Sequence, residues 1–375
     1  MKVISLCVVS ASLVLAAACA TGGAGGGGGG GGTPVPVPPA TTQQTTATSA
    51  IRWPVKTREH VDLWLHGFAM LQEDTTLVPF FRRGYRDQMV VLKNRANVIT
   101  QLDANRDKLR ARLLANPQLV NAQFVPLSFS SWDEMSQVVN FFLQAGGDPN
   151  RAQTRELAVA IATLAAYFQT GPDRDWLRLY VQSLGDESNR FYHSYWVEQQ
   201  RERSNVVGVV DSLWQKLYRP KMQAFLNNSG QANGDVLLSL PLDGEGRSQS
   251  NGKLQNVLTV TFPNTPAEAT DAIYVIAHEA VASIANSAVS DNLTPSEKRS
   301  GVGDRYTSAA AVRGGAMLLQ RVAPELLAGY ARYYLEAAKR PLGANPMTSL
   351  AAAFPLPDVI RDALGRQLDV VIGGI

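Results

Sequence analysis

The sequence predicts an α+β fold that is mostly α-helical and contains a small antiparallel β-sheet. Two observations lead to this class. Apolar residues recur at helical spacing through most of residues 51–375, whereas residues 235–242 and 253–262 carry the β-branched, alternating patterns of strands. With 45% hydrophobic and 18% charged residues, the 375-residue chain has an ordinary globular composition. The region after residue 50 is long enough to bury a core without covalent support.

Helices are expected in the first part of this region wherever start and stop signals frame an apolar period. Asn116-Pro117 stops the second helix, and the capping box Ser131-x-x-Glu134 opens the third. The apolar run of the fourth is broken only by Thr163, which predicts a central, buried helix. The expected helices cover residues 58–74, 83–114, 131–145, 157–168, 173–184, 188–200 and 205–226.

The chain changes character at a polar, glycine-containing loop after residue 226. The two strand-like segments are separated by Asp243-Gly-Glu-Gly246 and further polar residues, which predicts an antiparallel hairpin. Residues 123–129 would add a further strand to this sheet. Helices then return, with expected starts at Thr265, Thr294, Thr307, Pro324 and Pro357.

The first residues have the features of an export signal. Lys2 precedes an apolar run at 3–15, which is too short to span a bilayer and is followed by small residues at 16–18. Leu15-Ala-Ala-Ala-Cys19 resembles the cleavage motif of bacterial lipoprotein precursors, whose cysteine is lipidated and becomes the mature N-terminus. The resemblance implies a signal peptide at 1–18 and a lipid anchor, including palmitate, at Cys19. Leucine in that family more often stands one place nearer the cysteine, so ordinary cleavage to a soluble periplasmic or secreted protein stays the alternative.

Residues 19–50 are predicted to form a tether between the anchor and a globular domain at 51–375. From Ala20 to Ala50 the sequence has no charged residue, and a run of glycines leads into a proline-rich stretch. Such a segment buries no core and acts as a flexible chain followed by a stiffer spacer. In the lipoproteins that it resembles, a residue other than aspartate after the cysteine, here Ala20, implies sorting to the outer membrane. The domain has one candidate subdivision, into a helical part at 51–230 and a hairpin part at 231–375.

Charge and cysteine content limit the classes of partner and site. The chain has 35 Lys and Arg against 32 Asp and Glu, a formal net charge of +3. This balance gives no large basic field, which argues against nucleic acid as a partner. Its two cysteines, Cys7 and Cys19, both precede the globular domain, which therefore has no disulfide or thiolate metal site. The expected partners are the membrane, through Cys19, and an envelope protein or peptide.

The candidate for chemistry is a single apolar helix expected over 266–289. Thr265-Pro-Ala-Glu268 combines a capping box with proline at the first helical position. The helix is apolar on nearly every side, yet it carries His278 and Glu279 at its middle. These two side chains must be paired, hydrogen-bonded, neutral or metal-bound, because an unpaired buried charge is too costly.

A strand followed by a buried helix with His-Glu resembles the active-site region of gluzincin metallopeptidases. In that family His-Glu-x-x-His supplies two zinc ligands and the general base, and a later helix supplies a glutamate ligand. The resemblance covers residues 253–289 and implies a zinc ligand at His278 and a catalytic base at Glu279. The position of the second histidine is Ala282. Glu297 or Glu325 would stand for the glutamate ligand.

Two further histidines lie on the first expected helix. His60 and His66 are six residues apart and do not share a helix face, so they cannot chelate a metal as a pair. Asp62 and His66 are four apart and do share one. With this spacing, Asp62 could orient His66 as a metal ligand, or the two could form an ion pair on the surface. We predict the surface ion pair.

These features predict an exported cell-envelope lipoprotein that carries a non-catalytic binding module, either metallopeptidase-like or simply helical. The alternative is a zinc-dependent, gluzincin-type metallopeptidase of the cell envelope. The sequence has neither a Gly-x-Ser-x-Gly elbow nor a phosphate-binding P-loop, so it offers no serine-hydrolase or nucleotide motif.

Overall fold

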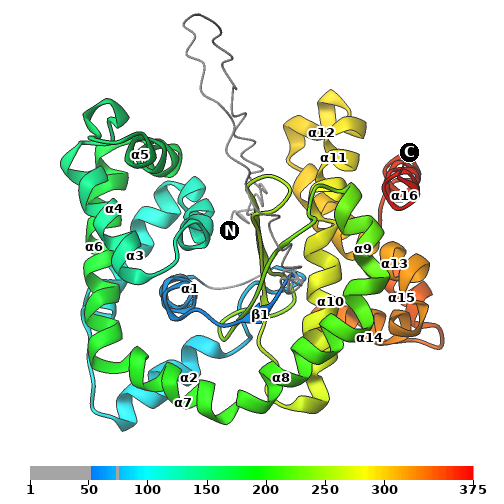
Figure 1. Cartoon of the computed structure of the whole chain (residues 1–375), viewed down its shortest axis with the longest axis horizontal. Coiled ribbons are helices and arrows are strands. Elements are labelled where there is room, and N and C mark those ends of the chain that lie inside the picture. The colour runs from blue at the N-terminus through cyan, green and yellow to red at the C-terminus, as the bar shows by residue number, and fades with distance from the viewer. Residues whose placement is uncertain (1–51, 73–75, 375) are drawn as a thin grey trace, which may run out of the picture.

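The computed structural model describes residues 52–72 and 76–374 and confirms a mostly helical α+β fold. The predicted signal peptide, lipidation site and tether lie outside the described residues. One sheet of four strands has the order β1-β2-β4-β3. In Figure 1 the sheet lies between an arm of earlier helices and an arm of later helices, here called the first arm and the second arm. The strands are β1 (Val55–Lys56), β2 (Gly234–Ser239), β3 (Arg247–Ser250) and β4 (Asn256–Thr261).

The sheet is mixed, so the predicted antiparallel hairpin is wrong in its pairing. β2 runs parallel to β4, from Gly234 opposite Asn256 to Ser239 opposite Thr261, and β1 runs parallel to β2. The antiparallel partner of β4 is β3, which lies in the segment predicted to be a connection. Its sequence Arg-Ser-Gln-Ser has no apolar alternation, so the periodicity that identifies strands does not reveal it.

The first arm is built from seven α-helices and two 3₁₀ helices. The helix predicted over 83–114 is in fact two helices, because Asn97 adopts a positive φ of 52° and Thr100 starts a new helix with a capping box to Asp103. Ser131 caps α4 as predicted, accepting the Glu134 N–H at 3.2 Å. The elements are α1 (Glu59–Leu71), α2 (Tyr85–Arg95), α3 (Gln101–Ala115), η1 (Pro117–Ser128), α4 (Trp132–Gln144), η2 (Pro149–Arg151), α5 (Arg155–Tyr167), α6 (Gly171–Glu187) and α7 (His193–Glu202).

Two further predictions for the first arm are wrong. The strand predicted at 123–129 is part of the 3₁₀ helix η1, which begins with the cap Asn116 and Pro117 and has Pro126 inside it. Proline lacks the N–H that a strand ladder needs. The predicted central helix, α5, buries only Ile161 and Leu164, and Val159 is 41% exposed. Its many alanines make it look apolar all round, although only one face packs on the arm.

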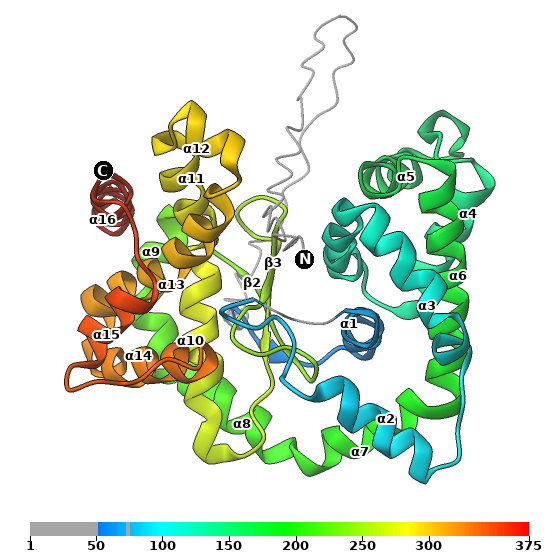
Figure 2. The ribbon, with the colours of Figure 1, turned by 180° about the vertical axis from the view of Figure 1, so that it is seen from behind.

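The second arm contains the remaining helices, seen from behind in Figure 2. The starts predicted at Thr294 and Pro357 are confirmed, whereas α13 begins at Gly303 and not at Thr307. Pro324 opens a 3₁₀ turn that leads into α14. The elements are α8 (Ser204–Leu213), α9 (Arg219–Asn228), η5 (Pro266–Glu268), α10 (Ala269–Ala280), α11 (Ala282–Asn292), α12 (Pro295–Ser300), α13 (Gly303–Val322), η6 (Pro324–Leu326), α14 (Leu327–Ala337), α15 (Pro346–Ala353) and α16 (Asp358–Gly373).

Two long helical runs contain a π-helical turn. η3 (Ser188–Tyr192) joins α6 to α7, and η4 (Trp214–Tyr218) joins α8 to α9. A π turn changes the register of the residues that follow it relative to those that precede it. In both turns an aromatic side chain, Tyr192 or Trp214, is fully buried. In a regular α-helix the residues after each turn would point in another direction. We infer that the π turns help to direct these aromatic side chains into the core.

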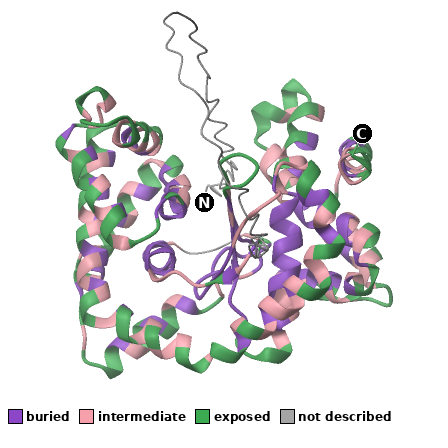
Figure 3. Ribbon diagram, in the orientation of Figure 1, coloured by how far each residue is buried: buried purple, intermediate pink, exposed green. Residues whose placement is uncertain are grey.

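Buried side chains form two clusters, and β2 contributes to both of them. Val236 and Leu238 belong to the second-arm cluster, whereas Leu237 belongs to the first-arm cluster, because alternate residues of a strand point to opposite faces. The second-arm cluster also includes Trp53 and buried residues of α8 and α9. In Figure 3 burial is concentrated in the sheet and in α10. The buried residues therefore do not divide at residue 230.

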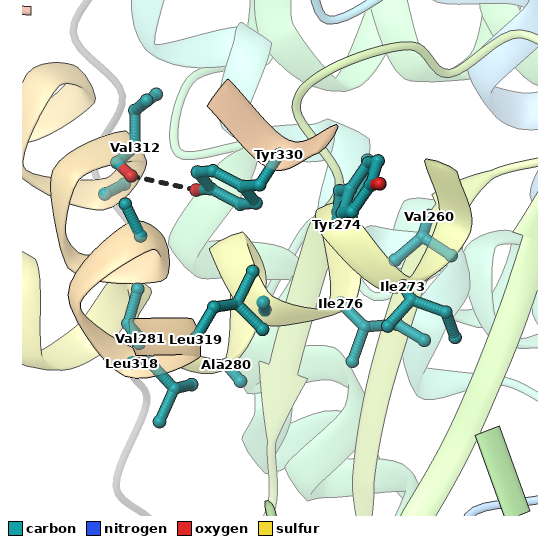
Figure 4. Packing of buried hydrophobic residues seen from close by; sticks show 14 of the residues in the cluster. Val260, Ile273, Tyr274, Ile276, Ala280, Val281, Val312, Leu318, Leu319 and Tyr330 are labelled. Carbon is teal, nitrogen blue, oxygen red and sulfur yellow. Dashed lines mark hydrogen bonds between the residues drawn. The ribbon is translucent and has the colours of Figure 1, made fainter. Parts of the chain in front are cut away.

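The helix predicted over 266–289 is divided at Val281 into α10 and α11. Every residue from Ala272 to Ala280 is buried, and α10 packs on β4 and α13. Figure 4 shows Ile273 near Val260 and the Tyr330 hydroxyl directed at the Val312 carbonyl, 2.9 Å away. Within the described residues, Pro266–Asn292 is the one helical stretch apolar and long enough to cross a membrane, and 67% of its most apolar window is buried in the fold. That burial is typical of the core helix of a folded domain.

Candidate functional site

His278 and Glu279 form a bonded pair near the end of α10, where they are only 3% and 7% exposed. His278 Nδ1 lies 3.0 Å from Glu279 Oε1, and the Gly246 N–H donates to the same oxygen at 3.0 Å. Burial raises the pKa of the Glu279 carboxyl. The hydrogen bond from His278 and the charges of His278 and Arg247 outweigh that effect, so the pKa lies below its ordinary value. Glu279 is therefore ionised, and Nδ1 is the ring nitrogen that donates a proton to it.

The other ring nitrogen of His278 is an exception among the buried polar atoms. Nε2 has no hydrogen-bond partner within the described residues. The ring stacks on Tyr334, with centroids 5.5 Å apart and planes 20° apart, and the Tyr334 hydroxyl donates to the Gly244 carbonyl at 3.0 Å. An imidazole that carries a proton on Nδ1 alone has a lone pair at Nε2, and such a nitrogen is a common metal ligand.

The segment between β2 and β3 supplies the backbone that holds Glu279. It is fixed by the chain before α2, since the Asp243 N–H donates to the Phe80 carbonyl at 2.9 Å and the Glu245 N–H donates to the Pro79 carbonyl at 3.2 Å. Gly246 is needed for a close approach. A Cβ at this position would lie 2.4 Å from the Thr259 carbonyl oxygen and 2.7 Å from Glu279 Cγ.

Replacing Gly246 by alanine is expected to lower the free energy of unfolding by about 1–3 kcal/mol, because the new methyl group must displace backbone or the Glu279 side chain. Urea denaturation followed by circular dichroism measures this change. Gly208→Ala is the matched control, since a Cβ there meets no atom within 4 Å and the residue is in helix α8. An equal loss in both variants would contradict the role of Gly246.

Arg247 is buried beside this backbone, at 3% exposure. Its Nε donates to Gln123 Oε1 at 2.7 Å, its Nη1 donates to the Gly246 carbonyl at 2.6 Å, and its guanidinium lies 4.1 Å from the centre of the Phe80 ring. Gln249 Nε2 also donates to Ser128 Oγ at 2.8 Å. Through these contacts η1 packs against β3, the strand at the end of the sheet. An extended peptide can add to a sheet as a further strand beside an edge strand such as β3. Here two side chains of β3 are bonded to η1.

A second carboxylate, Glu245, is buried in the same region, at 6% exposure. Ser308 Oγ of α13 donates to Glu245 Oε1 at 3.2 Å. Burial raises the pKa of Tyr334 well above its ordinary value, and the charges of Glu279 and Glu245 act in the same direction. Tyr334 is therefore a neutral hydrogen-bond donor between the histidine and the loop.

Neither predicted glutamate ligand joins His278 and Glu279 in a metal-binding group. The Glu297 carboxylate accepts the Thr294 N–H at 2.9 Å and caps α12, and Glu325 forms an exposed ion pair with Lys221. Residues 52–72 and 76–374 contain no group of three or more His, Cys, Asp or Glu placed to hold a metal ion. Position 282 is alanine, so the side chains around His278 do not fit a three-ligand zinc site.

Comparison with known proteins adds no further constraint. No protein-family model matches the chain, and no curated protein or solved structure shows significant similarity to it. The interpretation of the site therefore rests on its own geometry.

Several residues of the site were missed in the sequence because they are distant from His278 along the chain. Asp243-Gly-Glu-Gly246 has the composition of a turn, and only its two glycines hint at a close approach. Arg247 and Ser308 lie in no motif. The sequence therefore identifies the helix that carries the pair but not the loop that binds it.

Asp62 is buried, so the predicted surface ion pair with His66 is wrong. Asp62 and His66 are 1% and 0% exposed, and each bonds to other groups. Trp196 Nε1 donates to Asp62 Oδ2 at 3.0 Å and the Leu240 N–H donates to Oδ1 at 3.2 Å. Burial raises the Asp62 pKa to about 7, and these hydrogen bonds only partly oppose it.

His66 belongs to a buried ionic cluster that joins α1, α2 and α6. Its Nε2 lies 3.0 Å from Glu187 Oε1 and its Nδ1 lies 3.1 Å from the Tyr85 hydroxyl. Lys93 Nζ lies 2.8 Å from Glu187 Oε2. Burial raises the Glu187 pKa, but the hydrogen bond and charge of His66 and the charge of Lys93 outweigh it and lower the pKa to about 2. Glu187 is therefore an anion shared by His66 and Lys93 inside the first arm, and Asp103 also pairs with Lys93, at 2.6 Å.

Proposed function

We propose that this protein is an exported lipoprotein of the cell envelope, anchored to the outer membrane through Cys19, whose folded domain binds an envelope protein or peptide and does not hydrolyse it. One observation carries the non-catalytic part of this proposal. Glu279 Oε1 accepts from both the Gly246 N–H and His278 Nδ1, and the residue is 7% exposed. A general base must reach a water molecule or a substrate. A carboxylate bonded in this way instead links α10 to the segment before β3.

Two further observations support a structural role for the His-Glu helix. Two side chains of β3 bond to η1, which places η1 beside the edge strand to which an extended substrate would have to add. Ala282 removes the second histidine, and metal affinity falls steeply when one of three ligands is missing. Hydrolysis would require further zinc ligands besides His278, whereas binding requires none.

Full-length protein purified without chelator is expected to contain no stoichiometric zinc by elemental analysis, even after incubation with zinc. His278→Ala is expected to lower thermal stability, because it leaves the Glu279 carboxylate with one buried donor fewer. Peptidase assays on both proteins should show no turnover. About one zinc per chain that is lost in His278→Ala, or a chelator-sensitive peptidase activity, would refute the non-catalytic proposal.

A zinc-dependent metallopeptidase is the second candidate function, and the observation that favours it is the unpartnered Nε2 of His278. Under this alternative Glu279→Gln abolishes hydrolysis while the fold is kept. Glu156→Gln, a change at an exposed glutamate of α5, is the matched control. Hydrolysis that survives Glu279→Gln would eliminate this candidate.

The anchor is tested by Cys19→Ser in cells that are fed labelled palmitate. The wild-type protein is expected to incorporate the label and to fractionate with the outer membrane, whereas Cys19→Ser is expected to lose both properties, because stable anchoring requires several acyl chains. Cys7→Ser, a change inside the predicted signal peptide, should behave like the wild type. Membrane association of an unlabelled Cys19→Ser protein would favour another mode of attachment.

A further inference from the structure

A pocket with both apolar surface and amide side chains lies on the first arm, where the end of α3 and the start of η1 meet the end of α5 and the start of α6. Its volume is about 370 Å³, which falls within the range of small-ligand sites. The pocket shares no residue with the His278 site, so a ligand bound in it is independent of the proposed function. The side chains that determine its chemistry are Asn116, Gln118, Asn121, Tyr167, Gln169 and Asp173.

The one ionised side chain of this lining, Asp173, is already saturated. Its Oδ1 accepts from Arg112 Nη2 at 2.6 Å and from Asn116 Nδ2 at 3.0 Å, and its Oδ2 accepts from Thr170 Oγ1 at 2.6 Å. Asp173 is only 1% exposed, and Arg112 compensates its charge. These contacts make the floor of the pocket rigid and nearly neutral. A cation would find no available carboxylate there, and an anion would find no available guanidinium.

The remaining lining combines uncharged amide side chains with apolar surface. Asn121 Nδ2 donates to Gln118 Oε1 at 3.0 Å, and Gln169 Nε2 donates to the Ala166 carbonyl at 3.3 Å. Gln118 and Gln169 are exposed, and Asn121 and Tyr167 are half-buried, so their other polar atoms are accessible to a ligand. An apolar ligand would bury these groups unpaired at a cost in free energy.

We propose that this pocket binds a neutral saccharide. Each sugar hydroxyl both donates and accepts a hydrogen bond, so a saccharide can bond to the N–H groups and to the carbonyl oxygens of the amide side chains that line the pocket. Tyr167 is half-buried and lines the pocket together with the amides, so it adds an aromatic ring against which the C–H groups of a sugar can pack. The amide pair of Gln118 and Asn121 is oriented by its own hydrogen bond before the ligand arrives, which reduces the entropy lost on binding.

The test is a titration of the full-length protein with chitotriose, with maltotriose and with trialanine acetylated and amidated at its ends as an uncharged peptide, followed by ligand-observed NMR and calorimetry. We expect at least one saccharide to bind and trialanine not to bind. Gln118→Ala combined with Asn121→Ala should weaken saccharide binding about tenfold, the effect of losing one or two hydrogen bonds. Tyr167→Phe keeps the ring and removes the hydroxyl, and it should weaken binding by a smaller factor.

Gln144→Ala, a change at an exposed amide of α4 outside the pocket, is the control and should bind as the wild type does. Gln118 is exposed and Asn121 half-buried, so the double variant is expected to keep the wild-type melting temperature. Absence of saccharide binding up to about 10 mM would overturn the proposal. So would affinity that is unchanged in a folded double variant, or a preference for trialanine.

Discussion

Glu187→Gln is expected to lower the free energy of unfolding by about 3–5 kcal/mol, the cost of breaking a buried ion pair by removing one partner. The substitution removes the anion that lies 3.0 Å from His66 and 2.8 Å from Lys93, and it leaves Lys93 with Asp103, 2.6 Å away, as its one remaining carboxylate among these contacts. Urea denaturation at neutral pH measures the change. Asp186→Asn is the neighbouring control. Its side chain is 21% exposed, and we expect a loss below about 1 kcal/mol.

The same cluster predicts a dependence on acid. The pKa of Glu187 is about 2 in the folded protein, below its ordinary value of 4.5. A carboxyl group with a lowered pKa contributes stability that is present above its unfolded pKa and is lost as pH falls toward the folded value. Wild-type stability should therefore decline from about pH 4.5 to pH 2, and Glu187→Gln should decline less. If Glu187→Gln costs less than about 1 kcal/mol at pH 7, the cluster does not hold the first arm together.

Asp62→Asn is expected to remove a pH dependence of the opposite sign. The folded protein keeps a proton on Asp62 up to a pKa of about 7, whereas the ordinary value is 3.8. Between these values the folded state binds more protons than the unfolded state, so stability falls as pH rises and levels off above about 7. The span of roughly three pKa units corresponds to about 4 kcal/mol. Asparagine carries no charge, so this slope should disappear.

Denaturation of Asp62→Asn and of the wild type at intervals from pH 5 to pH 8 measures the slope. Asparagine has one side-chain oxygen, so the variant keeps the hydrogen bond from Trp196 or the one from the Leu240 N–H and loses the other. This loss costs about 1 kcal/mol of stability. It offsets part of the stability that the variant gains at pH 8 because no carboxylate is buried. Asp175→Asn, a change at an exposed residue, should leave the wild-type slope intact. An unchanged slope in Asp62→Asn would show that Asp62 is ionised in the folded protein.

Local signals in the sequence predict the ends of helices better than they predict the sheet. Ser131, Thr294 and Pro357 mark helix starts because a cap or a proline acts within one turn. β3 is polar because Arg247 bonds to Gln123 of η1, a contact across 124 residues of chain. The parallel pairing of β2 and β4 likewise depends on packing between distant elements, which no local pattern records.

The same distinction applies to the candidate site. An apolar helix is sufficient to predict that His278 and Glu279 are buried and bonded. The partner of Glu279 is a backbone N–H 33 positions away, which the side-chain sequence does not reveal. For Asp62 and His66 the helical spacing is correct, but all sides of α1 are covered by other elements, so polar spacing on that helix does not indicate a surface.

The two buried clusters determine where the chain can be cut. Trp53, Val55 and the buried residues of α8 and α9 share one cluster with the helices after β4, whereas α1 to α6 fill the other. A fragment that starts at residue 231 would thus lack Trp214 and Phe225 from its interior. β1 and α8 already touch, since the Val55 N–H donates to Asp211 Oδ1 at 3.2 Å. A fragment meant to keep the His278 helix with its native neighbours on the second-arm side must therefore include β1, α8 and α9.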